Sequence, residues 1–284
     1  VAFSNLPSIK QLEMFMDINQ NQKAVSPSLR LTLEKDLFWG SDRADSRIKA
    51  LRSAIIQTLG SDQKSPLFNR IQIGEDNAEL SSKPFATAIS SSGLLPHAKG
   101  NKYLEKHLLS CLYDTNNTDH NQEMEKSQKS ICKLISICYD FVETNYPEIY
   151  NRERYFIMSN RGTFAFINII GNLNSFLTDS QALNKKNTPQ KRFEEIEKYL
   201  VSLLDGIKNI KKQKEESLLT LIGAGADIKW LRFFQEIINS NFKAYNPVEL
   251  IEWKERNDSN IQSEGRSYGV SIEKYMKKQV LTNI

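Results

Sequence analysis

The feature that most constrains this fold is the recurrence of apolar side chains every three or four residues over much of the chain. That spacing places them along one side of a helix, which must then bury that side against other helices. In residues 123–145, for example, Ile131, Leu134 and Cys138 keep this register until Pro147 ends it. Similar patterns occupy residues 8–18, 26–38, 44–59, 84–95, 156–177, 193–214 and 227–242. The sequence therefore predicts a mainly α-helical protein.

Length and composition allow one large domain or two ordinary ones. The chain has 284 residues, of which 39% are hydrophobic and 25% charged, far from the composition of disordered chains. The polar stretch DTNNTDHNQ, residues 114–122, lacks a helical period and predicts a surface loop or a domain boundary. We therefore expect a first part of residues 1–115 and a helical C-terminal domain of residues 123–284.

Charge and cysteine content indicate the cellular compartment of the protein but not its function. The net charge of +4 permits contact with nucleic acid without arguing for it. Three cysteines in a chain of this length indicate free structural thiols in a reducing compartment. No apolar run reaches the ~20 residues of a membrane helix, and no secretory signal is visible. We expect a cytoplasmic protein without a membrane segment, and the initial Val1 suggests the later part of a longer chain.

Residues 14–27, MFMDINQNQKAVSP, form a sharp break between two helical patterns. Amide side chains and one ammonium group follow the end of the first pattern, and they suit contact with a nucleotide, a phosphate or a DNA backbone. These side chains belong to Asn19, Gln20, Gln22 and Lys23. The alternative is an ordinary asparagine C-cap followed by a solvated turn.

The same region resembles the end of the DGQHR module, a ParB-like family named for its Asp-Gly-Gln-His-Arg motif. The resemblance is carried by residues 1–3, 17–19, 22–23 and 25–26, and by Leu6, Gln11 and Phe15. Residues 65–68, 70–71 and 92–95 and Phe85 are similar to the helical part that follows in the family, and residues 160–162 and 223–234 to its C-terminal region. The motif itself does not occur in these 284 residues.

The resemblance implies that residues 1–115 are the helical tail of a ParB-like module, with Asn19, Gln20, Gln22 and Lys23 as a pocket wall. The family includes the DndB regulators associated with DNA phosphorothioation, so the resemblance also implies DNA and the proteins of a DNA-modification system as partners. Because the namesake motif is missing, we do not expect its chemistry in this polypeptide.

Several groups of cations are candidates for DNA contact. The helical pattern of residues 44–59 puts Arg43, Arg47 and Arg52 on its outer face, and Arg161 lies at the start of an apolar helix, where an anion could bind. The densest positive charge comprises Lys208, Lys211, Lys212 and Lys214, and Lys229 and Arg232 follow later. Ordinary solvated helix faces, and a turn capped by Thr163, are the alternatives.

Aromatic residues lie among the later cations. Trp230 and Phe233 alternate with Lys229 and Arg232, a mixture that can stack on bases and neutralise phosphates. The alternative places Trp230 and either Phe233 or Phe234 in the hydrophobic core and leaves the cations in solvent.

The sequence offers little for catalysis. His97, His107 and His120 lack a serine or cysteine in a nucleophile context, and the pair His107 and Cys111, read as one helix face, supplies two ligands where a closed metal site needs about four. The stretch GAGAD, residues 223–227, lacks the ending of a phosphate loop, so we interpret it as a helix–helix turn whose last residue caps the next helix. We therefore predict no catalytic residue, metal or cofactor and leave enzymatic activity open.

Our leading hypothesis is a DNA-associated regulator or accessory protein of a DNA-modification or phage-defence system. One rival is a helical scaffold for protein assembly, including assembly into a homo-oligomer. The other is a fragment of a ParB-like nucleotide hydrolase or nuclease that forms only one wall of the active site.

Overall fold

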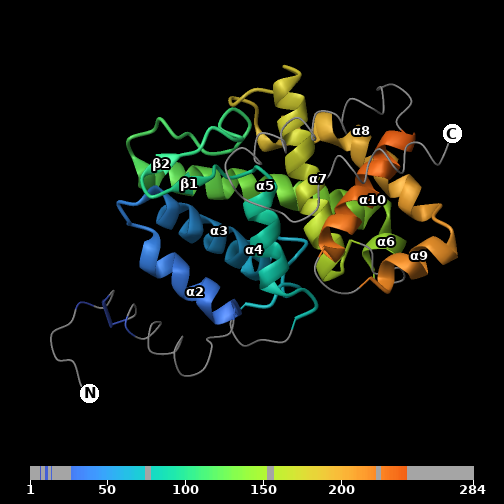
Figure 1. Ribbon diagram of the computed structural model, residues 1–284, viewed down its shortest axis with the longest axis horizontal. Coiled ribbons are helices and arrows are strands. Elements are labelled where there is room, and N and C mark those ends of the chain that lie inside the picture. Colours follow the sequence, from blue (N-terminus) through green and yellow to red (C-terminus); the bar gives the residue numbers. More distant parts are fainter. Residues whose placement is uncertain are drawn as a thin grey trace.

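The computed structural model describes residues 27–73, 78–151, 157–221 and 225–241, together with Pro7, Lys10, Gln11 and Met14 (Figure 1). These residues form nine helices and one two-stranded antiparallel sheet, which confirms the predicted mainly α-helical fold. In chain order the elements are α2 (Pro27–Phe38), α3 (Ala44–Ser61), α4 (Ser82–Ser91), β1 (Ala98–Lys99), β2 (Lys102–Tyr103), α5 (His120–Asn145), α6 (Pro147–Tyr150), α7 (Asn160–Asp179), α8 (Pro189–Lys208), α9 (Lys212–Leu219) and α10 (Ala226–Asn241). The predicted pocket wall of Asn19, Gln20, Gln22 and Lys23 lies outside the described residues.

Helix α7 lies at the centre of the described fold (Figure 1). Every residue from Gly162 to Leu177 is buried, because apolar side chains occur on all sides of this helix rather than along one stripe. Helices α4, α8 and α10 pack against it. The buried amide of Asn168 donates to the Phe164 carbonyl at 2.8 Å and accepts a hydrogen bond from the Ser91 hydroxyl of α4 at 2.9 Å, so this polar group is satisfied inside the fold.

The hydrophobic core continues across the expected boundary near residues 116–122. Helices α3 and α4, which precede this stretch, pack on α5 and α7, which follow it. At one of these crossings the side-chain amide of Gln128 donates to Thr58 Oγ1 at 2.7 Å. Buried residues from Leu31 to Ile238 form a single cluster. The described helices therefore share one core.

A break separates α8 from α9, so the single helix predicted for residues 193–214 is wrong. Helix α8 ends at Lys208, where the N–H of Asn209 bonds to the carbonyls of Asp205 and Ile207. Ile210 then packs against the core. The lysines around it favour a continuous helix by propensity, but burial of this isoleucine accounts for the turn. Helix α9 begins only at Lys212.

The two-residue strands β1 and β2 form a hairpin that we had not predicted. Gly100 and Asn101 make its loop, and Gly100 has a φ of 60°. Glycine adopts this left-handed conformation without steric cost and is favoured at the first position of such loops. Among the described helices none is long and apolar enough to cross a lipid bilayer.

Candidate nucleic-acid interface

Arg47 lies inside the fold, so its predicted position on the outer face of α3 is wrong. The residue is 4% exposed. Its Nη1 donates to the carbonyls of Ser41 and Asp42, both at 2.8 Å, and its Nη2 donates to the Tyr103 hydroxyl at 3.5 Å. The hairpin packs on α3 and covers a side that the helical period assigned to solvent. Arg47 therefore ties the α2–α3 connection to the hairpin, and its contact with DNA stays a prediction.

Arg52 also faces neighbouring helices rather than open solvent. Its Nη2 lies 2.8 Å from a carboxylate oxygen of Glu34, and its Nη1 donates to Ser90 Oγ at 3.2 Å. Glu34 is 5% exposed and also accepts a hydrogen bond from Ser53. Breaking such a pair leaves an uncompensated buried charge. The Arg52 side chain, 22% exposed, thus joins α2, α3 and α4.

Arg43 remains at the surface beside the start of α3, as predicted. Its side chain is 64% exposed, and its Nε and Nη2 donate to the Asp45 carboxylate at 3.1 and 2.8 Å. This bidentate pair raises the pKa of Arg43. The same hydrogen bonds, supported by the Gly100 N–H, hold the pKa of Asp45 well below its usual range.

The hairpin docks on the same carboxylate. The Gly100 N–H donates to Asp45 Oδ2 at 3.0 Å, and the Asp45 N–H donates to the Gly100 carbonyl at 3.0 Å. The second bond uses one of the backbone N–H groups that a helix start leaves without an intrahelical partner. The hairpin tip is therefore held at the first turn of α3.

The hairpin places Lys99 directly opposite Lys102. Both side chains are exposed, and neither makes an ion pair within the described part of the chain. Lys49, also exposed, follows Asp45 by one helical turn on α3. We refer to Arg43, Lys49, Lys99 and Lys102 as the hairpin surface. It combines cations from α3 and from the hairpin.

The sequence alone does not single out Lys99 and Lys102 as a pair. Only a short pattern indicates the hairpin: the glycine in the stretch AKGNKY, residues 98–103, marks a turn between two possible strands. Strands of two residues are too short to show an alternating pattern, which is why only the structure pairs these lysines.

Arg161, predicted to hold an anion at the start of α7, faces Asp227 on α10, with Nε and Oδ1 3.9 Å apart, and its contact with an anion stays a prediction. Ser159 caps α7 by accepting a hydrogen bond from the Gly162 N–H at 3.0 Å. Thr163, considered as a cap, is buried and donates to the Ile157 carbonyl. The first turn of α7 is thus partly satisfied by the chain itself.

The predicted lysine cluster is divided by the break between α8 and α9. Lys208 pairs with Glu148 at 3.0 Å. Lys211 and Lys212 are exposed, and Lys214 lies within α9. Helix α9 lies at the opposite end of the molecule from the hairpin (Figure 1).

Helix α10 carries the remaining predicted cations. Lys229 is exposed and Arg232 is half-buried. Trp230, Phe233 and Phe234 are 1%, 8% and 0% exposed, which confirms the core alternative. Their rings are therefore not free to stack on bases.

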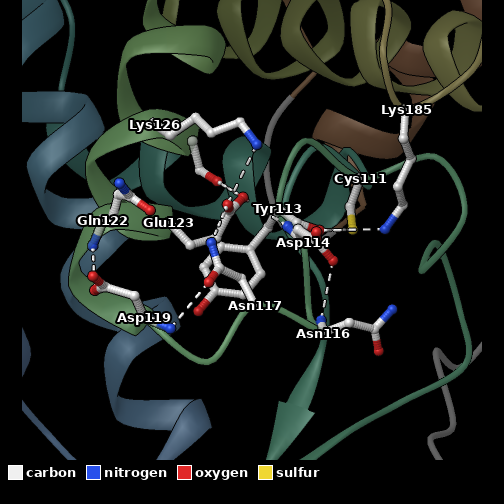
Figure 2. Close-up of polar contacts among 11 residues, drawn as sticks. Cys111, Tyr113, Asp114, Asn116, Asn117, Asp119, Gln122, Glu123, Lys126 and Lys185 are labelled. Atoms are coloured by element: carbon white, nitrogen blue, oxygen red, sulfur yellow. Dashed lines mark hydrogen bonds and ion pairs between the residues drawn. The ribbon is translucent and has the colours of Figure 1, made fainter.

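Figure 2 shows the polar loop that leads into α5. At its centre lies the carboxylate of Glu123, which is 2% exposed. It receives the Asp114 N–H at 2.8 Å, the Ser127 hydroxyl at 3.0 Å and the Asn117 amide at 3.2 Å, and it lies 3.5 Å from Lys126 Nζ. This carboxylate fastens the loop to the helix.

The other acidic groups of this loop are engaged locally. Asp119 caps α5 by accepting a hydrogen bond from the Gln122 N–H at 3.0 Å, and Asp114 accepts one from the Asn116 N–H at 3.0 Å. No group of three or more His, Cys, Asp and Glu side chains within the described ranges is arranged to hold a metal ion. The polar groups of this loop therefore stabilise the start of α5.

The three cysteine thiols lie inside the fold. Cys111, Cys132 and Cys138 are free and buried, and burial raises the pKa of each thiol, that of Cys132 to about 12. A thiol reacts as its thiolate, so these groups are poor nucleophiles at neutral pH. His107 has a positive φ and lies within a turn, so the helix face predicted for His107 and Cys111 is wrong.

The hairpin surface is the arrangement that best combines accessible cations from separate elements. No family model matches this chain, and neither a curated protein nor a solved structure matches it. The resemblance to the DGQHR family therefore stays an expectation from the sequence.

Proposed function

We propose that this protein is a DNA-associated regulator or accessory component of a DNA-modification or phage-defence system, acting in the cytoplasm. We further propose that it contacts the DNA backbone through the hairpin surface. The observation that carries this proposal is the pairing of Lys99 with Lys102, two exposed cations without an ion pair among the described residues. The link to DNA modification rests on the sequence resemblance alone.

The lysine pair has a physical cost that a polyanion would remove. Like charges directly opposite on paired strands are destabilising. The exposed Lys49 adds a further cation on α3, whereas Asp45 balances the charge of Arg43. Phosphate oxygens of a duplex would neutralise these groups and release counterions, which favours binding at low salt. Because such contacts are to the backbone, they favour affinity and orientation rather than a particular base sequence.

The rigid attachment of the hairpin supports the same proposal. Both backbone groups of Gly100 bond to Asp45, so the lysines are presented from a fixed position. A prearranged surface loses less conformational freedom on binding than a loose one.

The test is an anisotropy titration of a labelled duplex at several salt concentrations. We compare the wild-type chain with the double variant Lys99→Gln/Lys102→Gln. The control is Lys211→Gln/Lys212→Gln, which removes the same charge at the far end of the molecule. We expect the hairpin variant to weaken binding about tenfold at low salt and to reduce the salt slope by roughly 2, one phosphate contact per lysine.

The two double variants also separate the candidate surfaces. If only the Lys211 and Lys212 variant weakens binding, the interface lies near α9 and the hairpin surface is not used. If the wild-type chain shows no binding at low salt, the proposed DNA contact is wrong for this polypeptide.

A further inference from the structure

The turn that follows the hairpin exposes a large apolar side chain. Leu109 is 74% exposed, compared with 43% for Leu219 and 40% for Ile228, the other large exposed hydrophobic residues in the described ranges. Its neighbour Ser110 is 3% exposed. The chain thus passes from a largely exposed residue to a buried one in a single step.

The turn that carries Leu109 is firmly anchored on its C-terminal side. The Cys111 N–H donates to the His107 carbonyl at 2.8 Å, and the Ser110 carbonyl accepts a hydrogen bond from the Asn174 amide of α7 at 2.8 Å. The Ser110 hydroxyl also lies 2.9 Å from that of Ser175. These bonds connect the turn to the central helix of the fold.

The backbone of the turn is strained at His107. This residue has a φ of 65°, in the left-handed region that side chains other than glycine seldom adopt. Its ring packs against Gly93, where an added Cβ would lie 2.8 Å from His107 Nδ1. The packing holds a conformation that costs roughly 1 kcal/mol or more, a pattern often found at functional sites.

The turn is a direct continuation of the hairpin. Beyond the pairs Lys99–Lys102 and Ala98–Tyr103, the Leu104 N–H donates to the His97 carbonyl at 2.8 Å. The rings of His97 and His107 are 6.0 Å apart. At about 3.4 Å per strand residue, the lysine pair lies roughly 7 Å along the hairpin from its base. The turn that carries Leu109 thus follows the base of the hairpin in the chain, while the lysines occupy the hairpin tip.

We propose that Leu109 is an apolar wedge that enters the minor groove of duplex DNA and partly unstacks one base step, while the hairpin lysines hold the flanking phosphates. This inference rests on the proposed function. Minor-groove proteins use leucine and similar side chains in this way, beside lysines and arginines, and the insertion kinks the duplex. The segment from Ala98 to Leu109 carries three lysines and one glutamate, Glu105, so its charge complements a polyanion such as DNA rather than a basic partner.

The experiment measures the bend of a duplex labelled at both ends, by resonance energy transfer, together with its affinity. The variant is Leu109→Ser, which removes an exposed side chain and leaves the charge unchanged. The matched control is Leu219→Ser, an exposed leucine on α9 at the other end of the molecule (Figure 1). Thermal unfolding of both variants verifies that the fold is intact.

We expect the wild-type chain to bring the duplex ends closer together, and Leu109→Ser to abolish that change and weaken binding about fivefold with the salt slope unchanged. The Leu219→Ser control should behave as the wild type. Equal bending by wild type and Leu109→Ser would overturn the wedge while leaving the DNA contact intact, and so would a wild-type complex without any bend. Failure of the wild-type chain to bind DNA at all would instead reject the proposed function.

Discussion

Asp45 and Gly100 bind each other twice: the Gly100 N–H donates to the Asp45 carboxylate, and the Asp45 N–H donates to the Gly100 carbonyl, both at 3.0 Å. The bond donated by the Gly100 N–H depends on the negative charge of the Asp45 carboxylate. Because Arg43 also donates to this carboxylate, the attachment of the hairpin is linked to the ionisation of Asp45.

This linkage predicts an acid-sensitive contribution to stability. The pKa of Asp45 is lowered in the folded state, chiefly by the hydrogen bonds from Arg43. A group of this kind stabilises the fold fully above its unfolded pKa of about 4, and the contribution is lost as the pH falls towards the folded value. We expect Asp45→Asn to lower the free energy of unfolding by about 1 kcal/mol at pH 7 and by progressively less below pH 4.

Urea denaturation at pH 7, 5, 3 and 2 measures this difference. Asp42→Asn is the matched control, since Asp42 is an exposed aspartate in the connection just before α3, and its substitution should have little effect at any pH. A stability gap between wild type and Asp45→Asn that is constant over this range would contradict the linkage.

The long helices were predictable from the sequence because burial of a continuous apolar pattern decides them. The 26-residue α5 and the almost wholly buried α7 are clear examples. The apolar pattern of residues 227–242 likewise made burial of Trp230 one of the two predicted alternatives. Such patterns are local in sequence and need no knowledge of neighbouring elements.

Features that depend on distant packing were not predictable. Arg47 has a helical position that the period assigns to solvent, but the hairpin, about fifty residues later in the chain, covers it. The turn at Ile210 and the pairing of Lys99 with Lys102 have the same origin. In each case tertiary contacts override local propensity.

Gly171 marks the closest approach of α7 to the end of α4. An added Cβ at this position would collide with the backbone oxygen of Ser92 and lie 2.6 Å from its Cβ. Alanine favours helices over glycine, so propensity alone predicts that Gly171→Ala stabilises the protein. We expect instead a loss of about 1–3 kcal/mol, because the two helices must separate. Thermal or urea unfolding measures it.

Gly40→Ala is the control for this substitution. No atom lies within 4 Å of a Cβ added at Gly40, so we expect a change within about 0.5 kcal/mol. An increase in the unfolding midpoint of Gly171→Ala would mean that α4 and α7 are less tightly packed than the contact with Ser92 requires.

The thiols provide a probe of the core that needs no mutation. Burial raises the pKa of Cys132 to about 12 and keeps Cys138 protonated as well. At pH 8 in native buffer we expect the three thiols to react with a thiol-specific reagent far more slowly than free cysteine. In denaturant all three should react at once, which also counts them as free. Rapid labelling of the native protein would contradict the burial of these residues.

Among the described residues, the buried carboxylate of Glu123 is contacted only by hydrogen-bond donors. The Asp114 N–H and the Ser127 hydroxyl bind one oxygen, and the Asn117 amide and Lys126 approach the other (Figure 2). In Glu123→Gln one oxygen becomes an NH2 group, which places a donor against donors in a buried site. We expect a loss of about 2–3 kcal/mol in the free energy of unfolding.

The matched control is Glu125→Gln, which makes the same chemical change on an exposed side chain two residues further along α5. Its effect should lie within about 0.5 kcal/mol. Hydrogen exchange at the Asp114 amide supplies an independent measurement, since this N–H is bonded to Glu123 and should exchange faster only in Glu123→Gln. Equal stability of the two variants would mean that the loop before α5 is held by its Asp119 cap alone, and that the buried carboxylate contributes nothing to the start of this helix.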